Sequence, residues 1–176
     1  MPAGQGAAAG EARAYVGLGS NLGDRAGNLL LGVRGMLAAG LAVARLSSVY
    51  ETEPFGVVED QPAFLNMVAE LAAPLPPAEE LLRVLLGVES SLGRRRPRPL
   101  APRTLDLDLL LYGDALHASA SLTLPHPRLH LRRFALAPLA ELIPEARHPA
   151  LGATFAQLLD AAGGAARVER WEPGDG

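Results

Sequence analysis

Residues 103–112 read Arg-Thr-Leu-Asp-Leu-Asp-Leu-Leu-Leu-Tyr, and this stretch decides both the fold and the chemistry of the chain. Its leucines predict a buried β-strand, in which residues two apart point to the same face. Asp106 and Asp108 therefore stand side by side, with their Cα atoms roughly 6.5 to 7 Å apart. Like charges on an apolar strand repel each other and are poorly solvated, whereas bound cations remove both problems. Ligands that are all oxygen favour Mg²⁺ over Zn²⁺. The alternative is a strand end with two solvated aspartates.

Arginines crowd the segment before this strand, residues 94–103, which contains no acidic residue. They are Arg94, Arg95, Arg96, Arg98 and Arg103. Guanidinium groups beside carboxylate-bound metal ions form a clamp for a polyphosphate, because arginine forks hold the nonbridging oxygens while the metal neutralises the remaining charge. The alternative is a solvated basic loop that balances two aspartates. That alternative explains the charge but not the alternate spacing of the aspartates.

Downstream of the strand, His126 lies between two prolines and is followed by Arg132 and Arg133. A histidine in a proline-rich turn can be purely structural. With Arg132 at the start of a predicted helix, it can also contact a phosphate. The sequence leaves both interpretations open.

The elements around the acidic strand give the fold class. They are, in chain order, a strand at residues 14–19, a helix from Asp24 to Gly40, strands at 43–51 and 64–71, a helix from Pro76 to Gly93 and the acidic strand. The order βαββαβ predicts an α+β, ferredoxin-like sandwich, with an antiparallel sheet and two helices on one face. Further helical patterns at 132–142 and 154–159 predict extra C-terminal helices.

Three of the four phenylalanines, Phe55, Phe64 and Phe134, form a second candidate site. Aromatic residues usually belong to the core. A planar heterocycle, however, is bound by stacking between rings, while amide groups read its edge. Asn66 shares a strand face with Phe64 and can supply such hydrogen bonds.

Composition excludes several kinds of chemistry. The chain of 176 residues has 49% hydrophobic residues and a net charge of −3, so no global field indicates a nucleic acid or a membrane as partner. It has no Cys, and all 16 cationic residues are Arg. Thiolate nucleophiles, disulfides, Schiff-base lysines and a P-loop lysine are therefore excluded. With no signal peptide or anchor pattern, we expect a cytoplasmic protein.

The domain organisation is simple. We expect a disordered leader over residues 1–13, one domain over 14–163, and a flexible tail over 164–176 that is rich in glycine and charge. We also expect a monomer.

Taken together, several motifs in order over about residues 14–159 resemble the hydroxymethyl-dihydropterin pyrophosphokinase family of folate biosynthesis, whose fold is ferredoxin-like. These motifs are Gly17-Leu-Gly-Ser-Asn-Leu22, Ser48-Val-Tyr-Glu-Thr52, Asp60-Gln-Pro-Ala-Phe-Leu-Asn66, Glu89-Ser-Ser-Leu-Gly-Arg94, Pro102-Arg-Thr-Leu-Asp-Leu-Asp108, Pro125-His126 and Arg132-Arg-Phe-Ala-Leu136. The resemblance implies a magnesium-dependent transferase that moves pyrophosphate from ATP to the pterin.

The resemblance also implies roles for single residues. Asp106 and Asp108 would hold two Mg²⁺, with Asp106 also near the pterin hydroxymethyl group. The remaining ligand contacts fall into two sets. Those for ATP are Arg94, Arg96, Arg103, Thr123, His126 and Arg132, and those for the pterin are Thr52, Phe55, Phe64, Asn66 and Phe134. Glu89 matches a family position for which the sequence gives no role.

The chain departs from the family in the loop before the acidic strand. The family usually reads Arg-Trp-Gly-Pro-Arg there, whereas this chain has Pro99-Leu-Ala-Pro-Arg103. Leu100 thus replaces the lid aromatic. Two other functions remain as alternatives: another two-metal nucleotidyl- or phosphotransferase, and a ferredoxin-like RNA-binding module. The acidic central strand disfavours the second, which requires a basic sheet face.

Overall fold

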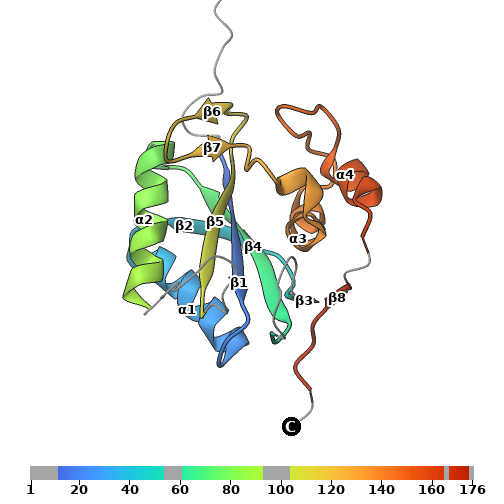
Figure 1. The fold of residues 1–176 in the computed structure, drawn as a ribbon. Coiled ribbons are helices and arrows are strands. Elements are labelled where there is room, and N and C mark those ends of the chain that lie inside the picture. The colour runs from blue at the N-terminus through green and yellow to red at the C-terminus, as the bar shows by residue number, and fades with distance from the viewer. Residues whose placement is uncertain (1–11, 54–60, 93–103, 165–166, 175–176) are drawn as a thin grey trace, which may run out of the picture.

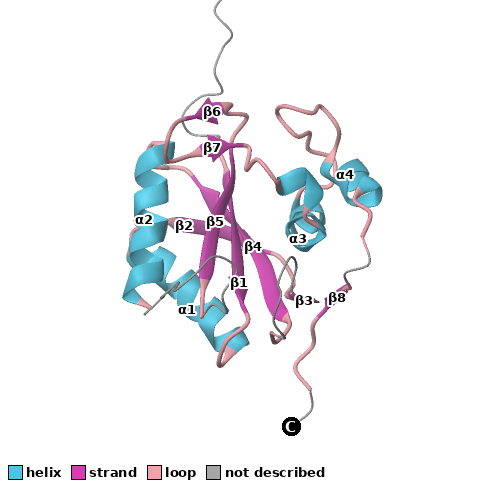
Figure 2. Ribbon diagram, viewed as in Figure 1, coloured by secondary structure: helices cyan, strands magenta, loops and turns pink. Residues whose placement is uncertain are grey.

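The computed structural model describes residues 12–53, 61–92, 104–164 and 167–174. Helices lie on both sides of a central sheet (Figures 1 and 2). The strands are β1 Ala14–Ser20, β2 Ala42–Leu46, β3 Tyr50–Thr52, β4 Phe64–Ala72, β5 Asp106–Tyr112, β6 His117–Ala118, β7 Thr123–Leu124 and β8 Val168–Arg170. The helices are α1 Arg25–Ala38, α2 Ala78–Ser91, the 3-10 helix η1 Leu129–Leu131, α3 Arg133–Leu142 and α4 Phe155–Ala161.

The strand order is β5-β1-β4-β3-β8, with β2 also paired to β4, and neighbouring strands are antiparallel. This order, with helices after the first strand and before β5, confirms the predicted α+β ferredoxin-like fold. The helical patterns beyond β5 form α3 and α4, as the sequence predicted. A small hairpin of β6 and β7 lies beside the N-terminal end of α2 (Figure 1).

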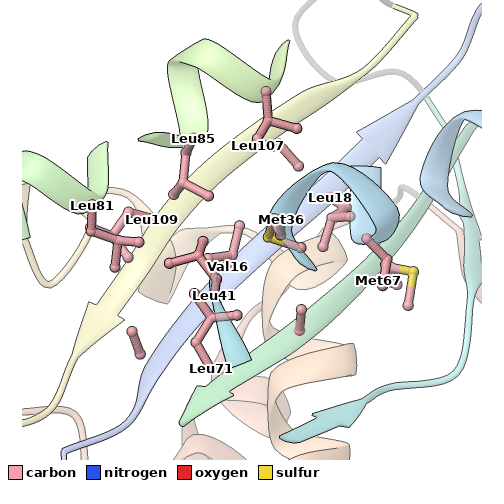
Figure 3. Packing of buried hydrophobic residues seen from close by; sticks show 14 of the residues in the cluster. Val16, Leu18, Met36, Leu41, Met67, Leu71, Leu81, Leu85, Leu107 and Leu109 are labelled. Carbon is pink, nitrogen blue, oxygen red and sulfur yellow. The ribbon is translucent and has the colours of Figure 1, made fainter. Parts of the chain in front are cut away.

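The sheet separates two apolar layers. On one face, α1 and α2 pack against the leucines of β1, β4 and β5. Figure 3 shows Leu81 and Leu85 of α2 pointing toward Leu109 and Val16 of the sheet. On the other face, α3 and α4 pack against Val68 and its neighbours, but they cover only part of that face. Within the described ranges, no helix combines the length and apolar character needed to cross a lipid bilayer.

The single strand predicted at residues 43–51 is two strands, β2 and β3. Ser47 lies between them, where its N–H donates to the Val68 carbonyl at 2.9 Å and its Oγ accepts from the Val68 N–H at 2.8 Å. The serine side chain thus replaces one backbone partner and interrupts the ladder. Both strands still pair with β4.

The segment predicted to be a flexible tail, residues 164–176, contains a short strand. Val168–Arg170 form β8, which pairs with β3, and the Trp171 N–H donates to the Val49 carbonyl at 2.8 Å. The composition suggested a loose segment, yet β3 offers an unpaired edge and Trp171 packs against the core beneath α1 and α2.

Candidate active site

A row of residues across the middle of the sheet forms the floor of the site. Gly19 on β1 lies opposite Asp106 of β5 on one side and Asn66 of β4 on the other. Residues paired in this way point to the same face, so the two polar side chains flank a position that has none. A Cβ at Gly19 would lie 2.8 Å from Asn66 Oδ1. Glycine at this position therefore keeps the floor open.

The first cleft lies over this floor, because α3 and α4 cover only the neighbouring part of the face, around Val68 and Leu110. We call it the sheet-face cleft. Its lining is Gly17, Leu18, Gly19, Thr52, Glu53, Phe64, Asn66, Met67, Val68, Asp106, Asp108, Leu110, Arg132, Phe134 and Ala135. The predicted pterin residues Thr52, Phe64, Asn66 and Phe134 thus lie together, although they come from β3, β4 and α3.

Polar groups in this cleft are held in place by one another. Asn66 Nδ2 donates to Thr52 Oγ1 at 2.8 Å, and both side chains are buried. Phe134 lies opposite the sheet on α3, and the Arg132 guanidinium carbon is 5.6 Å from the centroid of its ring. An aromatic wall above fixed amide and hydroxyl groups suits a planar, polar-edged ring.

A second cleft lies along the edge of β5 that faces away from β1, where no strand is paired among the described residues, and we call it the edge cleft. Its lining is Leu82, Leu86, Glu89, Asp106, Leu107, Asp108, Leu109, Ser119, Ala120, Ser121, Leu122, Thr123, His126 and Pro127. Thr123 and His126, both predicted to bind the nucleotide, thus share one cleft. Asp106 and Asp108 line both clefts, so β5 forms the boundary between them.

Glu89, for which the sequence gave no role, supports this boundary. Its side chain is 2% exposed, and Oε1 accepts from the Leu107 N–H at 2.6 Å. Leu107 lies between the two aspartates on an edge strand, where no further strand is paired in the described sheet. A buried carboxylate from α2 thus fixes the backbone of β5 between Asp106 and Asp108. The sequence signal was a glutamate in register with the apolar face of α2, four residues after Leu85.

His126 is oriented by the backbone. Its N–H donates to the Leu110 carbonyl at 2.9 Å, and its Nδ1 accepts from the Arg128 N–H at 3.2 Å. With Nδ1 as an acceptor, the neutral ring carries its proton on Nε2, which makes Nε2 a donor. Burial lowers the pKa of the His126 ring below its ordinary value. The negative charge of Asp108 raises this pKa, and the positive charges of Arg132 and Arg128 lower it further. The ring can therefore donate to a phosphate oxygen from the edge cleft.

Arg132 immediately precedes α3 and lines the sheet-face cleft beside Phe134. Burial lowers its pKa, while the nearby Asp108 carboxylate raises it. A guanidinium remains charged at neutral pH even so. Arg132 thus places a cation beside Asp108, although its cleft is the one lined by the pterin residues. The predicted residues Phe55, Arg94, Arg96 and Arg103, and the lid position Leu100, lie outside the described residues.

Sequence comparison decides the family. Residues 15–144 match the family described as 7,8-dihydro-6-hydroxymethylpterin-pyrophosphokinase (HPPK). The chain belongs to the HPPK family. A Synechocystis relative named 2-amino-4-hydroxy-6-hydroxymethyldihydropteridine pyrophosphokinase is 43% identical over 148 residues, which cover 84% of this chain and 74% of the relative. A Bacillus subtilis relative of the same name is 43% identical over 80% of this chain and 83% of its own length.

Solved structures agree on the HPPK fold. An HPPK-DHPS structure in complex with substrates superposes with a TM-score of 0.67 at 12% identity, over 86% of this chain and 43% of that chain. The wild-type Plasmodium falciparum HPPK-DHPS with pteroate gives a TM-score of 0.68 at 14% identity, over 85% and 44%. The chain thus spans less than half of these longer proteins. At such identities the likeness establishes the fold alone.

Proposed function

We propose that this protein transfers pyrophosphate from ATP to 6-hydroxymethyl-7,8-dihydropterin, giving AMP and the pterin diphosphate, a step of tetrahydrofolate biosynthesis. Membership of the HPPK family supports the reaction class. The observation that carries the proposal for the site is the position of Asp106 and Asp108, which line both clefts. A nucleotide in one cleft and an alcohol in the other would meet at these two carboxylates.

The pterin fits the sheet-face cleft. The ring would lie between Phe134 and the predicted Phe55, near Phe64, and Asn66 and Thr52 would form hydrogen bonds with its edge. Phe55 stays a predicted part of this pocket. In this arrangement the ring occupies the part of the sheet face at Gly17 and Gly19, because glycine has no side chain that would fill this space.

ATP fits the edge cleft. Thr123 would contact the nucleotide, and His126 would donate to a phosphate oxygen. Arg132 would approach the phosphates from the side of the pterin, near Asp108. The contacts predicted for Arg94, Arg96 and Arg103 stay predictions from the sequence.

Two Mg²⁺ ions suit the donor set. Asp106 and Asp108 offer only oxygen ligands, and within the described ranges no group of three or more Asp, Glu or His gathers to complete a cage. Mg²⁺ typically binds through one or two carboxylates and takes its other ligands from phosphates and water. Bound there, the ions would supply neutralisation of the phosphate charge.

The chain itself then has mainly to align the two substrates. The pterin hydroxyl oxygen forms a bond to the β-phosphorus of ATP, while the bond from this phosphorus to the α,β-bridging oxygen breaks. AMP leaves with that electron pair, and the hydroxyl proton departs to a base or to water. Asp106 and Asp108 border both clefts, and the family resemblance predicts that Asp106 lies near the pterin hydroxymethyl group. His126 and Arg132 would stabilise the developing charge.

The product nucleotide tests the proposal. Purified protein, ATP, Mg²⁺ and the hydroxymethyl-dihydropterin should give AMP and a pterin diphosphate in equal amounts by chromatography and ³¹P NMR, and a chelator should stop the reaction. Formation of ADP would indicate transfer of a single phosphate, and an unchanged pterin would overturn the proposal. The monomeric state and the cytoplasmic location stay predictions, and light scattering of the purified protein would test the first.

A further inference from the structure

We propose that the strand β8 is a positioning element for the pterin side of the active site. The match to the HPPK family ends at residue 144, whereas β8 spans Val168–Arg170. The inference rests on the proposed function of the sheet-face cleft. It concerns a segment that composition alone predicted to be a flexible tail.

The partner of β8 is the strand that forms one wall of this cleft. β8 pairs with all of β3, with Thr52 opposite Val168 and Tyr50 opposite Arg170. The ladder continues on both sides, since the Trp171 N–H donates to the Val49 carbonyl at 2.8 Å and the Glu53 N–H donates to the Arg167 carbonyl at 3.3 Å. Figure 1 shows the two short strands side by side below α3. Without β8, the three residues of β3 would be a sheet edge paired only to β4.

β3 contributes a residue that both pairs with its neighbouring strands and lines the sheet-face cleft. Thr52 is paired to Phe64 of β4 as well as to Val168, and its Oγ1 accepts from Asn66 Nδ2. Thr52 and Glu53 both line the sheet-face cleft. A shift of β3 would therefore move the hydroxyl that holds Asn66 in its orientation.

Glu141 joins β8 and β3 to the opposite wall of the cleft. It lies two helical turns after Phe134 on α3. Its carboxylate accepts from the Ser48 N–H at 2.7 Å, from Ser48 Oγ at 2.6 Å and from Tyr50 Oη at 3.4 Å. Arg170 Nη2 donates to the same carboxylate at 3.0 Å. The Glu141 side chain thus connects α3, which carries Phe134, to the segment of Ser48 and β3, which carries Thr52. Through Arg170, β8 binds to the same carboxylate.

The contacts of β8 distinguish between the two substrates. No residue of β3 or β8 lines the edge cleft in the part of the chain that the structure describes. Loss of β8 should therefore weaken binding of the pterin and leave binding of a nucleotide unchanged. By linkage, a bound pterin should hold β8 more firmly in place.

Two arginines of this segment provide a matched pair of variants. Arg170→Ala removes the bond to Glu141, whereas Arg167→Ala removes an exposed pair with Glu169 at 2.7 Å on the same segment and leaves the bond to Glu141 in place. Both variants lose one positive charge from the same strand region. A third protein ends after Gly164 and lacks β8 altogether. Trp171 is the single tryptophan, so its fluorescence reports whether β8 is docked.

Calorimetry with the pterin and, separately, with a nonhydrolysable ATP analogue tests the proposal. We expect the pterin Kd to rise about tenfold in the protein that ends after Gly164 and about threefold in Arg170→Ala, with the wild-type value in Arg167→Ala. In turnover assays the KM for the pterin should rise with little change in kcat, and adding pterin to Arg170→Ala should shift the Trp171 emission toward the wild-type spectrum.

Three outcomes separate the possibilities. Equal pterin affinity in wild type and Arg170→Ala, with an undocked Trp171 in the variant, would overturn the role of β8 even if the shortened protein fails to fold. Equal losses in Arg170→Ala and Arg167→Ala would also overturn it, because they would indicate an effect of charge alone. Failure of the unshortened 176-residue chain to bind or convert the pterin would instead refute the proposed function.

Discussion

The two faces of the central sheet use the same strands for different purposes. On the face under α1 and α2, alternate residues of β1, β4 and β5 are aliphatic, as with Leu18, Met67 and Leu107, and they are buried. On the other face, the residues between them include Gly19, Asn66 and Asp106, and α3 covers only part of the surface. The covered face holds the strands in place. The open face can therefore carry polar groups that contribute to binding more than to folding.

The largest effect should come from the carboxylates of the open face. Asp106→Asn and Asp108→Asn should each lower kcat by roughly 10³-fold or more, the equivalent of about 4 kcal/mol, because a neutral amide binds Mg²⁺ poorly. Each change also removes one of two like charges on β5, so the metal-free fold should be no less stable than wild type. Turnover assays and thermal melts without Mg²⁺ measure the two quantities. A marked fall in melting temperature would show that Asp106 and Asp108 stabilise the fold rather than serve the reaction.

The covered face should respond in the opposite way. Leu85→Ala removes a fully buried side chain from α2 and should lower the free energy of unfolding by about 2–5 kcal/mol. The folded fraction should keep the wild-type kcat at low temperature, since Leu85 lines neither cleft. Urea unfolding and activity assays measure this. If Leu85→Ala had the wild-type free energy of unfolding but a lower kcat, the covered face would contribute to catalysis, which contradicts the proposed difference between the two faces.

A smaller effect is expected at the glycine of the open face. Gly19→Ala places a Cβ 2.8 Å from Asn66 Oδ1, so the Asn66 side chain must move. Its hydrogen bonds to the edge of the pterin should then weaken. We expect the pterin Kd to rise up to about tenfold, or about 1.4 kcal/mol. Gly87→Ala on α2 is the matched control, because its Cβ would meet no atom within 4 Å. This control should stabilise the helix by roughly 0.5–1 kcal/mol and leave pterin binding unchanged.

The smallest effect is expected where a carboxylate on the open face lies away from the clefts. Glu70 Oε2 accepts from Arg45 Nη2 at 2.7 Å and from Tyr15 Oη at 2.7 Å. The bond to Arg45 lowers the pKa of Glu70 below its unfolded value of 4.5, although burial opposes this. The ionised carboxylate therefore stabilises the fold fully above pH 4.5, and this stabilisation is lost as the pH falls through the lower, folded pKa.

Glu70→Gln keeps an acceptor but loses the charge. Because the Arg45 side chain is half exposed, we expect the variant to be less stable than wild type by about 1 kcal/mol or less at pH 7. The difference between the two proteins should disappear in acid. Urea unfolding at a series of pH values measures this, and a difference that does not change with pH would show that Glu70 acts through packing.

The sequence by itself determined the βαββαβ order and the family. Apolar periodicity marks the strands and helices, and the Asp106-Leu-Asp108 spacing fixes two carboxylates on one face of a strand wherever that strand lies. Caps that are local in sequence, such as Asp24 accepting from the Gly27 N–H, likewise belong to the sequence signal. These features depend on neighbours within a few residues, so no knowledge of the tertiary structure is required to predict them.

Only the tertiary structure decided which residues share a cleft. It placed Asp106 and Asp108 at the boundary of two clefts and gave Glu89 its bond to the Leu107 N–H. It also divided the strand predicted at 43–51 and paired Val168–Arg170 with β3. These outcomes depend on contacts between residues far apart in the chain. The composition of residues 164–176, which are rich in glycine and charge, does not indicate that part of the segment pairs with the edge of β3.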